Sequence, residues 1–183
     1  MLNYKFCKIS EIEHADINKT LKLLSKSQFD YIQSLNEIKQ KQSMAVRALL
    51  HRILTDCFNG LSVSSLNIDA NGKPYLENSN LYISLTHSGD YVGCAVSNNT
   101  VGIDIEKIRP VNEKTVHRVC SESEKDAIKS YADFIGIWTL KEAYVKATGE
   151  TNCKFSEISF SQDNFNIITN EIDGYMYSVL EII

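Results

Sequence analysis

The chain has 183 residues, of which 43% are hydrophobic and only two are proline. This composition predicts a folded protein with one domain, or with two small halves that share a core. A net charge of −4 without a basic stripe argues against nucleic-acid binding. No apolar run is long enough to cross a membrane, so no membrane partner is expected.

Five cysteines, an odd number, occur at positions 7, 57, 94, 120 and 153 without any C-x-x-C spacing. Such cysteines are expected to be free thiols in a reducing cytoplasm rather than disulfides or zinc ligands. The first ten residues, MLNYKFCKIS, lack the pattern of a signal peptide. The expected location of the protein is therefore the cytoplasm.

The N-terminal third is predicted to be mainly helical. Residues 10–26 carry apolar side chains at helical spacing, and Ser27 is the expected N-cap of a short second helix. A longer helix is predicted over about residues 39–58, ended by Asn59-Gly60. Arg47 and Arg52 are expected to lie off the apolar side of this helix.

The remaining chain is predicted to alternate strands and helices. After an Asn71-Gly72 turn, residues 81–97 form a hairpin around Gly89-Asp90. A helix over residues 122–132 and a second over 137–148 are separated by Asp133 or Gly136, and Gly149 ends the second helix. Residues 61–76 are predicted to hold a strand-like stretch with Val63, Leu66 and Ile68 before that Asn71-Gly72 turn. Further strands are predicted over residues 101–106, 155–160, 165–169 and 175–182.

The stretch VGIDIE, residues 101–106, carries the most chemical information. Its alternation buries Val101, Ile103 and Ile105 and turns Asp104 and Glu106 to the opposite face of a strand. Gly102 leaves that face uncrowded, which suits a ligand lying against the backbone.

A second acidic stretch, WTLKEAYVKATG, lies over residues 138–149. On a helix it places Glu142 and Lys146 four residues apart, with Lys141 beside them. Together with Asp104 and Glu106, these residues suit an Mg²⁺–phosphate site, because Mg²⁺ binds few carboxylates plus substrate phosphates. Taken singly, each motif also fits a solvated strand face or a surface helix pair.

A degenerate internal repeat is also present. Helix 39–58 precedes VSSLNI and YVGCAVS, and helix 137–148 precedes FSEISF and MYSVLEI. The repeat predicts an α+β fold built as a pseudo-twofold pair of helix-plus-antiparallel-sheet halves. The expected halves are residues 1–98 and 99–183, in one compact and monomeric unit, with the ligand in the cleft between them.

Five pieces in one order resemble the 4′-phosphopantetheinyl transferase family, of the short type that modifies carrier proteins. They are Gly72-Lys73-Pro74, ISLTHSGDYV from Ile83, GIDIE, Ser121-x-x-Glu124 and WTLKEAYVKATG. The resemblance covers residues 72–149. It implies transfer of the phosphopantetheine arm of coenzyme A to a serine of an acyl or peptidyl carrier protein, with release of adenosine 3′,5′-bisphosphate.

The resemblance also implies roles for individual residues. Asp104, Glu106 and Glu142 fall at Mg²⁺ ligands, and Glu124 falls at a proposed general base. Contacts to the nucleotide and phosphates of coenzyme A are implied for five residues: Lys73, Thr86, His87, Lys141 and Lys146. Lys146 is also expected to act in catalysis, since metal and lysine together neutralise a diphosphate under attack.

The sequence departs from the family pattern in two places. Cys120 replaces an aromatic residue before Ser121, and Gln40, Gln42 and Ser43 stand where relatives carry basic residues toward the nucleotide phosphate. Arg47 and Arg52 are the candidates to replace those basic residues.

Two other functions fit the same residues. One is a homologue that binds carrier protein or coenzyme A without turnover. The other is an unrelated Mg²⁺-dependent phosphohydrolase that uses the same carboxylates.

Two surfaces are candidates for binding the carrier protein. Residues 1–55 carry nine Lys or Arg against five Asp or Glu, a net +4, whereas residues 56–183 carry ten against eighteen, a net −8. The family's carrier proteins are expected to be acidic, so the N-terminal lysines form one candidate surface: Lys19, Lys22, Lys26, Lys39 and Lys41. An apolar contact near residues 120–124 is the alternative, with the lysines merely solvated.

Overall fold

The computed structural model describes residues 1–58, 60–70, 72–160 and 163–183. Asn59 and Asn71, which belong to the predicted helix stop and turn, lie outside the described residues. The elements in chain order are β1 (Leu2–Lys8), the 3₁₀ turn η1 (Ile9–Glu11), α1 (His14–Leu21), α2 (Lys26–Ser34), α3 (Glu37–Cys57), η2 (Val63–Ser65), β2 (Leu66–Ile68), β3 (Pro74–Leu76), β4 (Tyr82–Ser88), β5 (Tyr91–Ser97), β6 (Val101–Lys107), α4 (Glu113–Val119), α5 (Glu122–Ala127), α6 (Tyr131–Thr148), η3 (Phe155–Glu157), β7 (Phe165–Ile172) and β8 (Tyr175–Ile182).

Two antiparallel three-stranded sheets share one topology. The first has the order β1-β5-β4, and the second has the order β6-β8-β7. Each follows a strand, helix, strand, strand sequence, in which the first strand pairs with the last. The fold is therefore α+β with helix-plus-antiparallel-sheet units, as predicted. A separate two-stranded ribbon is formed by β2 and β3.

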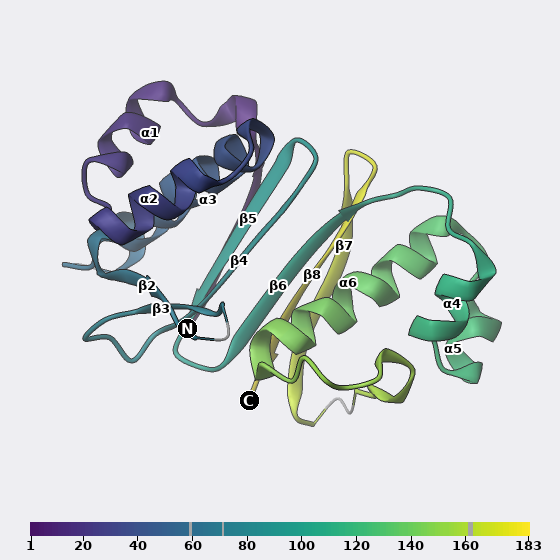
Figure 1. The fold of residues 1–183 in the computed structure, drawn as a ribbon. Helices are drawn as coiled ribbons and strands as arrows, with labels where there is room; N and C mark the ends of the chain where they lie inside the picture. Colours follow the sequence, from purple (N-terminus) through teal and green to yellow (C-terminus); the bar gives the residue numbers. More distant parts are fainter. Residues whose placement is uncertain (59, 71, 161–162) are drawn as a thin grey trace.

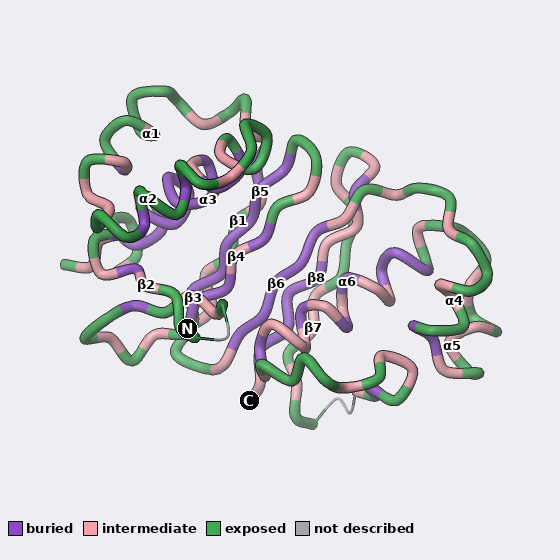
Figure 2. The backbone as a smooth tube through the Cα atoms, viewed as in Figure 1, coloured by how far each residue is buried: buried purple, intermediate pink, exposed green. Residues whose placement is uncertain are grey.

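The two sheets meet side by side along β4 and β6, in the middle of the molecule (Figure 1). One polar tie is the Ile103 backbone N–H, which donates to Ser84 Oγ at 3.1 Å. Apolar packing surrounds it, because Val101 and Ile103 are fully buried against Ala95. Helix α3 covers the first sheet and α6 covers the second, and burial is concentrated in α3, β5, β6 and β8 (Figure 2).

Gly102 explains how closely α6 approaches β6. A Cβ atom at this position would lie 1.8 Å from the Ala143 carbonyl oxygen of α6. The expected ligand against Gly102 is therefore wrong, since the helix backbone fills that space. The close approach brings the carboxylate face of β6 directly under Glu142 and Lys146 of α6.

Most predicted elements appear, with corrected ends. The hairpin forms as β4 and β5, β6 extends over 101–107, β8 spans 175–182, and Gly149 ends α6 with φ +79°. The cap of α2 is Ser25 rather than Ser27, and Arg47 is buried rather than off the apolar side of α3.

Two predictions for the C-terminal half were wrong. Asp133 and Gly136 do not interrupt a helix, because Ser130 and Asp133 form a capping box that starts α6 at Tyr131. Residues 155–160 contain a 3₁₀ turn instead of a strand. Helix α4 was not predicted, and neither was strand β1 at the N-terminus, which completes the first unit.

Among the described residues, no helix is long and apolar enough to span a membrane.

Candidate functional site

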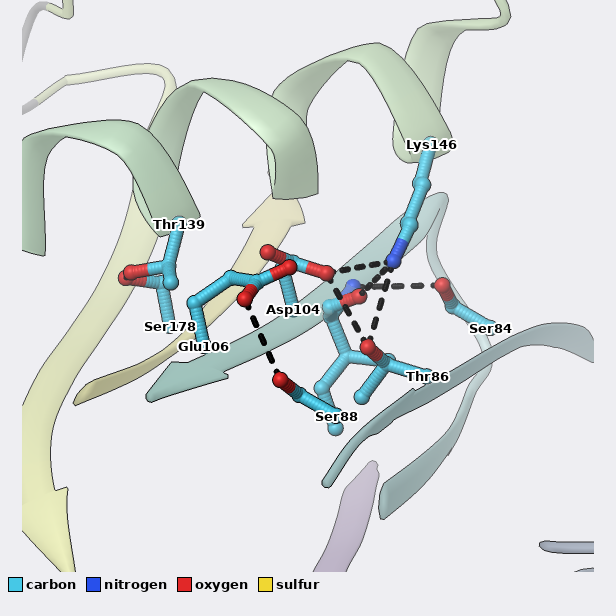
Figure 3. A network of polar contacts seen from close by, with 9 residues as sticks. Ser84, Thr86, Ser88, Asp104, Glu106, Thr139, Lys146 and Ser178 are labelled. Atoms are coloured by element: carbon cyan, nitrogen blue, oxygen red, sulfur yellow. Dashed lines mark hydrogen bonds and ion pairs between the residues drawn. The ribbon is translucent and has the colours of Figure 1, made fainter. Parts of the chain in front are cut away.

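The candidate site lies where β4, β6 and α6 meet. Strand β4 presents Ser84, Thr86 and Ser88 at every second position, and β6 presents Asp104 and Glu106 on the face that looks toward α6 (Figure 3). The last turns of α6 lie above these side chains. The alternation of polar residues in ISLTHS is the sequence signal that would have found the β4 side of the site.

Asp104 and Lys146 form the centre of the site. Lys146 Nζ donates to Asp104 Oδ1 at 2.6 Å, to the Ile103 carbonyl at 3.2 Å and to Thr86 Oγ1 at 3.3 Å (Figure 3). Thr86 Oγ1 donates in turn to Asp104 Oδ1 at 3.0 Å. The Asp104 side chain is only 8% exposed and that of Lys146 is 32% exposed, so the pair lies in a partly desolvated setting.

Two further carboxylates share the electrostatic field of Asp104. Burial raises the pKa of Glu106, and the Asp104 charge raises it further. Burial also raises the pKa of Glu142, and the charges of Asp104 and Glu106 raise it further. Ser88 Oγ donates to Glu106 Oε2 at 3.1 Å, whereas no hydrogen bond reaches Glu142 from the described part of the chain. Three acidic groups thus repel one another across β6 and α6.

The donor set suits a hard cation. Asp104 Oδ2 is buried and has no hydrogen-bond partner among the residues that the structure describes, which is costly unless something binds it. Glu106 and Glu142 add carboxylate oxygens, the ligands that Mg²⁺ prefers. Within residues 1–58, 60–70, 72–160 and 163–183, however, no three His, Cys, Asp or Glu side chains already converge as a formed metal site. The Lys146 ammonium is the nearest positive charge in the structure to the Asp104 carboxylate.

Lys73 and His87 lie beside this centre. Lys73 Nζ donates to the Ala147 carbonyl at the end of α6 and shares a cavity of about 350 Å³ with Lys146. His87 lines a larger cavity, of about 590 Å³, between β4 and helices α2 and α3. Burial lowers the pKa of His87, and the charge of Lys146 lowers it further, so His87 is close enough to Lys146 to respond to it.

Arg47 belongs to the wall of the larger cavity. Its guanidinium is buried, with Nε and Nη2 donating to Gln28 Oε1 and Nη1 donating to the Ser43 carbonyl and hydroxyl. All these partners are neutral, and no carboxylate of the described residues pairs with it. Buried charges are normally paired, so the wall of this cavity holds a guanidinium that only neutral acceptors satisfy. Arg52 instead lies exposed near Asp56.

Lys141 and Glu124 lie apart from the carboxylate centre. The Lys141 side chain is fully buried, and its Nζ donates to Glu124 Oε2 at 2.6 Å, to the Phe155 carbonyl at 2.9 Å and to the Val119 carbonyl at 3.0 Å. Glu124 Oε2 also accepts from the Ser121 backbone N–H at 2.7 Å. A phosphate contact is therefore not assigned to Lys141, which holds α5, η3 and the end of α4 on α6.

Comparisons with known proteins bear on the same part of the chain. The model of the 4′-phosphopantetheinyl transferase superfamily matches residues 100–180, which include β6, α6 and the three carboxylates. The crystal structure of Thermotoga maritima holo-[acyl-carrier-protein] synthase aligns with a TM-score of 0.40 and 23% identity, over 45% of this chain and 62% of that one.

Three relatives illustrate the range of similarity. The 4′-phosphopantetheinyl transferase gsp of Aneurinibacillus migulanus is 36% identical over 43% of this chain and 35% of its own length. The 4′-phosphopantetheinyl transferase HetI of Nostoc is 32% identical over 67% of this chain and 57% of its own length. The holo-[acyl-carrier-protein] synthase of Nautilia profundicola is 37% identical over 34% of this chain and 65% of its own length.

The chain thus spans about one third to two thirds of the length of these relatives. The matched region carries both halves of the carboxylate centre, on β6 and on α6. Residues 100–180 of the chain are therefore similar to the 4′-phosphopantetheinyl transferase superfamily.

Proposed function

We propose that the protein transfers the 4′-phosphopantetheine arm of coenzyme A to a serine of an apo acyl or peptidyl carrier protein. The reaction is expected to need Mg²⁺ and to release adenosine 3′,5′-bisphosphate. The observation that carries the proposal is Asp104, which is paired with Lys146 through Oδ1 and left without a partner at the buried Oδ2.

Asp104, Glu106 and Glu142 would hold the Mg²⁺ ion. When bound, the ion would neutralise negative charge on the diphosphate of coenzyme A as the phosphorus–oxygen bond breaks. The unpaired oxygen of Asp104 and the raised pKa values of Glu106 and Glu142 support this assignment. A bound cation would give that oxygen a partner and would reduce the repulsion between the three carboxylates.

Lys146 would act on the diphosphate itself. Its ammonium lies between β4 and β6, within hydrogen-bond reach of Thr86, and borders the same cavity as Lys73. An ammonium placed there can donate to phosphate oxygens whose charge grows during the reaction. Thr86 fixes the position of Lys146 and Asp104 through its hydroxyl.

The cavity of about 590 Å³ is assigned to the nucleotide of coenzyme A. Its volume suits a ligand of this size, and His87, Lys39 and the buried Arg47 provide positive or neutral donors along it. Arg47 takes the role of the basic residues missing at Ser43 and its neighbours, and it does so from one helical turn further along α3.

In the reaction, the serine Oγ forms a bond to the phosphorus that carries the pantetheine arm. The bond from that phosphorus to the bridging oxygen breaks, and the electron pair leaves with adenosine 3′,5′-bisphosphate. The serine proton passes to a carboxylate of the site or to water, and Glu124 is the carboxylate implied by the family pattern. Its contacts with Lys141 and Ser121 favour a positioning role instead.

The test is a transfer assay. The protein is incubated with coenzyme A, Mg²⁺ and a panel of apo carrier proteins from fatty-acid, polyketide and peptide synthesis, and intact mass is recorded. Addition of one arm to at least one carrier supports the proposal, and omission of Mg²⁺ should stop the addition. Failure with every carrier, or phosphate release from nucleotides without any carrier, would contradict it.

A further inference from the structure

Three hydroxyl side chains on one face of β4 join the two sheets at the candidate site. Ser84 binds the backbone of β6, and Thr86 binds the Asp104 carboxylate. Ser88 Oγ donates to Glu106 Oε2 at 3.1 Å (Figure 3). The strands β4 and β6 belong to different sheets, so the position of one relative to the other depends on side chains of this kind. Ser88 is thus the hydroxyl through which β4 reaches Glu106.

Glu106 depends on this contact for its position. The negative charge of Asp104 acts on Glu106, and that of Glu106 acts on Glu142, so repulsion drives the three carboxylates apart. Among the described residues, Ser88 Oγ is the one group that donates a hydrogen bond to Glu106. A glutamate side chain has several rotatable bonds, so a fixed donor removes much of its rotamer freedom. The bond holds one oxygen of Glu106 and leaves the other open to a cation.

Ser88 is itself held by the turn that follows it. Gln42 Nε2, on α3, donates to the Gly89 carbonyl at 2.9 Å. The Ile9 backbone N–H donates to the Asp90 carbonyl at 2.8 Å. The end of β4 is therefore tied to α3 and to the segment that follows β1, both of which belong to the first sheet's half of the molecule.

The same turn also rests on the second sheet. A Cβ atom at Gly89, where φ is +53°, would lie 2.3 Å from the Tyr175 hydroxyl of β8. The Tyr91 hydroxyl, at the start of β5, donates to Asp173 Oδ2 at 2.8 Å, and Asp173 belongs to the turn between β7 and β8. Contacts from both sheets thus fix the end of β4 before any ligand binds. Support of this kind keeps the geometry of a site precise.

The cavities beside β4 separate Ser88 from the groups assigned to the substrate. The neighbouring His87 lines the cavity assigned to the nucleotide, and Lys73 and Lys146 line the smaller cavity next to it. As far as the described residues show, Ser88 belongs to the wall of neither cavity. Its hydroxyl is directed instead to the Glu106 carboxylate of β6 (Figure 3).

We propose that Ser88 is a positioning residue of the Mg²⁺ site, whose hydroxyl holds the Glu106 carboxylate beside Asp104 and so strengthens cation binding. This inference rests on the proposed function, which assigns the cation to Asp104, Glu106 and Glu142. Groups that hydrogen-bond to metal ligands contribute about 10- to 100-fold to metal affinity or activity. Ser88 acts through Glu106 and is itself assigned neither to the cation nor to coenzyme A.

The test measures cation affinity directly. Mn²⁺ is titrated into the metal-free protein, and the bound fraction is obtained from the loss of the free-ion electron paramagnetic resonance signal. We expect Ser88→Ala to raise the Kd for Mn²⁺ roughly tenfold. Ser88→Thr keeps a hydroxyl at the same position and suits a strand, so its Kd should stay within about threefold of the wild-type value. A Kd for Ser88→Thr as high as that of Ser88→Ala would contradict a role of the hydroxyl.

Ser178→Ala is the matched control. Ser178 lies opposite Asp104 in the pairing of β8 with β6, and it is fully buried. Its hydroxyl pairs with the hydroxyls of Thr139 and Thr169, at 2.9 Å each, and with no carboxylate of the described residues. The control therefore removes a serine hydroxyl beside the same site without removing a partner of Glu106. It should lower the melting temperature, because buried hydrogen bonds are lost, and leave the Kd for Mn²⁺ as in the wild type.

Transfer kinetics separate this role from contact with the substrate. In Ser88→Ala, the Mg²⁺ concentration that gives half-maximal transfer should rise about tenfold, and kcat at saturating Mg²⁺ should stay within about twofold of the wild-type value. Loss of a substrate contact would instead raise the KM for coenzyme A at saturating Mg²⁺. That result would overturn the positioning role.

The remaining outcomes distinguish this inference from the proposed function. An unchanged Kd for Mn²⁺ in Ser88→Ala, or an equal loss in Ser178→Ala, overturns the positioning role, and transfer by the wild type then leaves the proposed function intact. Weakened Mn²⁺ binding in Ser88→Ala, with a wild type that modifies no carrier, supports the positioning role and contradicts the proposed function. A wild type that binds no Mn²⁺ overturns the positioning role together with the metal assignment.

Discussion

Lys146 Nζ lies 2.6 Å from Asp104 Oδ1, and the two residues are 42 positions apart in the chain. The pair joins the last turns of α6 to the middle of β6. Glu142, one helical turn earlier on α6, faces the same strand without a hydrogen-bond partner among the described residues. The Asp104 carboxylate is therefore stabilised by an ion pair, whereas the Glu142 carboxylate is destabilised by burial and by repulsion from its neighbours.

This difference predicts opposite effects on stability. Asp104→Asn removes the partner of Lys146 and should cost about 1–2 kcal/mol, a value reduced because Lys146 is partly exposed. Glu142→Gln should instead raise the melting temperature at pH 7 by a few degrees. Both variants should lose transfer activity by at least about 100-fold.

The pH dependence of the Glu142 effect follows from its raised pKa. The folded protein holds the Glu142 proton more tightly than the unfolded chain. The contribution of Glu142 to stability is thus fully present below the pKa of the unfolded chain and is lost as pH rises through the folded pKa. Thermal melts in EDTA should show the gain from Glu142→Gln at pH 7 and little gain at pH 4. An equal gain at both pH values would contradict the account.

Gly102→Ala should disrupt the site by separating two backbones. The added Cβ would lie 1.8 Å from the Ala143 carbonyl, and no side-chain movement relieves a clash with backbone. We expect a loss of about 3 kcal/mol or more in the free energy of unfolding, measured by denaturant titration.

Gly136→Ala is the control for this variant, since its new methyl group would meet Met176 and Thr169 side chains at 3.3 and 3.5 Å. It also gains up to about 1 kcal/mol of helix propensity. A stable Gly102→Ala protein with normal activity would show that α6 does not need its close approach to β6.

Glu124→Gln separates a positioning role from a role as general base. The amide oxygen of glutamine can still accept from Lys141 and from the Ser121 N–H. If Glu124 only positions α5 against α6, kcat should fall less than about tenfold and the shape of the pH–rate profile should not change. Both variants remove the counter-charge of the buried Lys141, and Glu124→Ala should lower stability further because it also removes the hydrogen-bond acceptor. A large loss of kcat in Glu124→Gln, with loss of the acid limb, would restore the role of base.

His51 predicts a pH dependence of stability far from the site. Both ring nitrogens are buried, and no group in the described part of the chain forms a hydrogen bond with them, where α1 packs on α3. Burial, and then the charge of Lys19, lowers the pKa of His51. Its contribution to stability is present above the pKa of the unfolded chain, about 6.5, and is lost as pH falls through the folded pKa.

His51→Leu should therefore flatten the loss of stability between about pH 7 and pH 5. His14→Leu, on the exposed face of α1, is the control and should keep the wild-type slope. The measurement is the denaturant midpoint across this pH range. Equal slopes in the wild type and in His51→Leu would contradict the assignment.

Local patterns predicted the strand and the helix that carry the candidate site. The alternation of VGIDIE and the spacing of Glu142 and Lys146 are set by strand and helix periods, and the structure has both elements. The prediction of a ligand against Gly102 was wrong, because a small residue on a strand indicates that something lies close to it but does not show what that is. Strand β1 was missed because its exposed tyrosine and lysines obscure the alternation, and β5 supplies its pairing.

Long-range contacts account for the other differences. Nothing in the local sequence connects Lys141 with the carbonyls of Val119 and Phe155, so this lysine resembled a phosphate ligand beside Lys146. Arg47 was placed off the apolar side of α3 because the position of Gln28 on α2, which buries it, depends on tertiary packing.

The central claim is that Lys146, beside the Asp104 carboxylate, promotes phosphopantetheine transfer. The most direct test is kcat/KM for coenzyme A with wild-type protein and Lys146→Ala, measured by intact mass of an apo carrier at saturating Mg²⁺. The account predicts a loss of about 100-fold or more, with the KM for carrier nearly unchanged. Near wild-type kcat/KM for coenzyme A, or a loss confined to the KM for carrier, would contradict it.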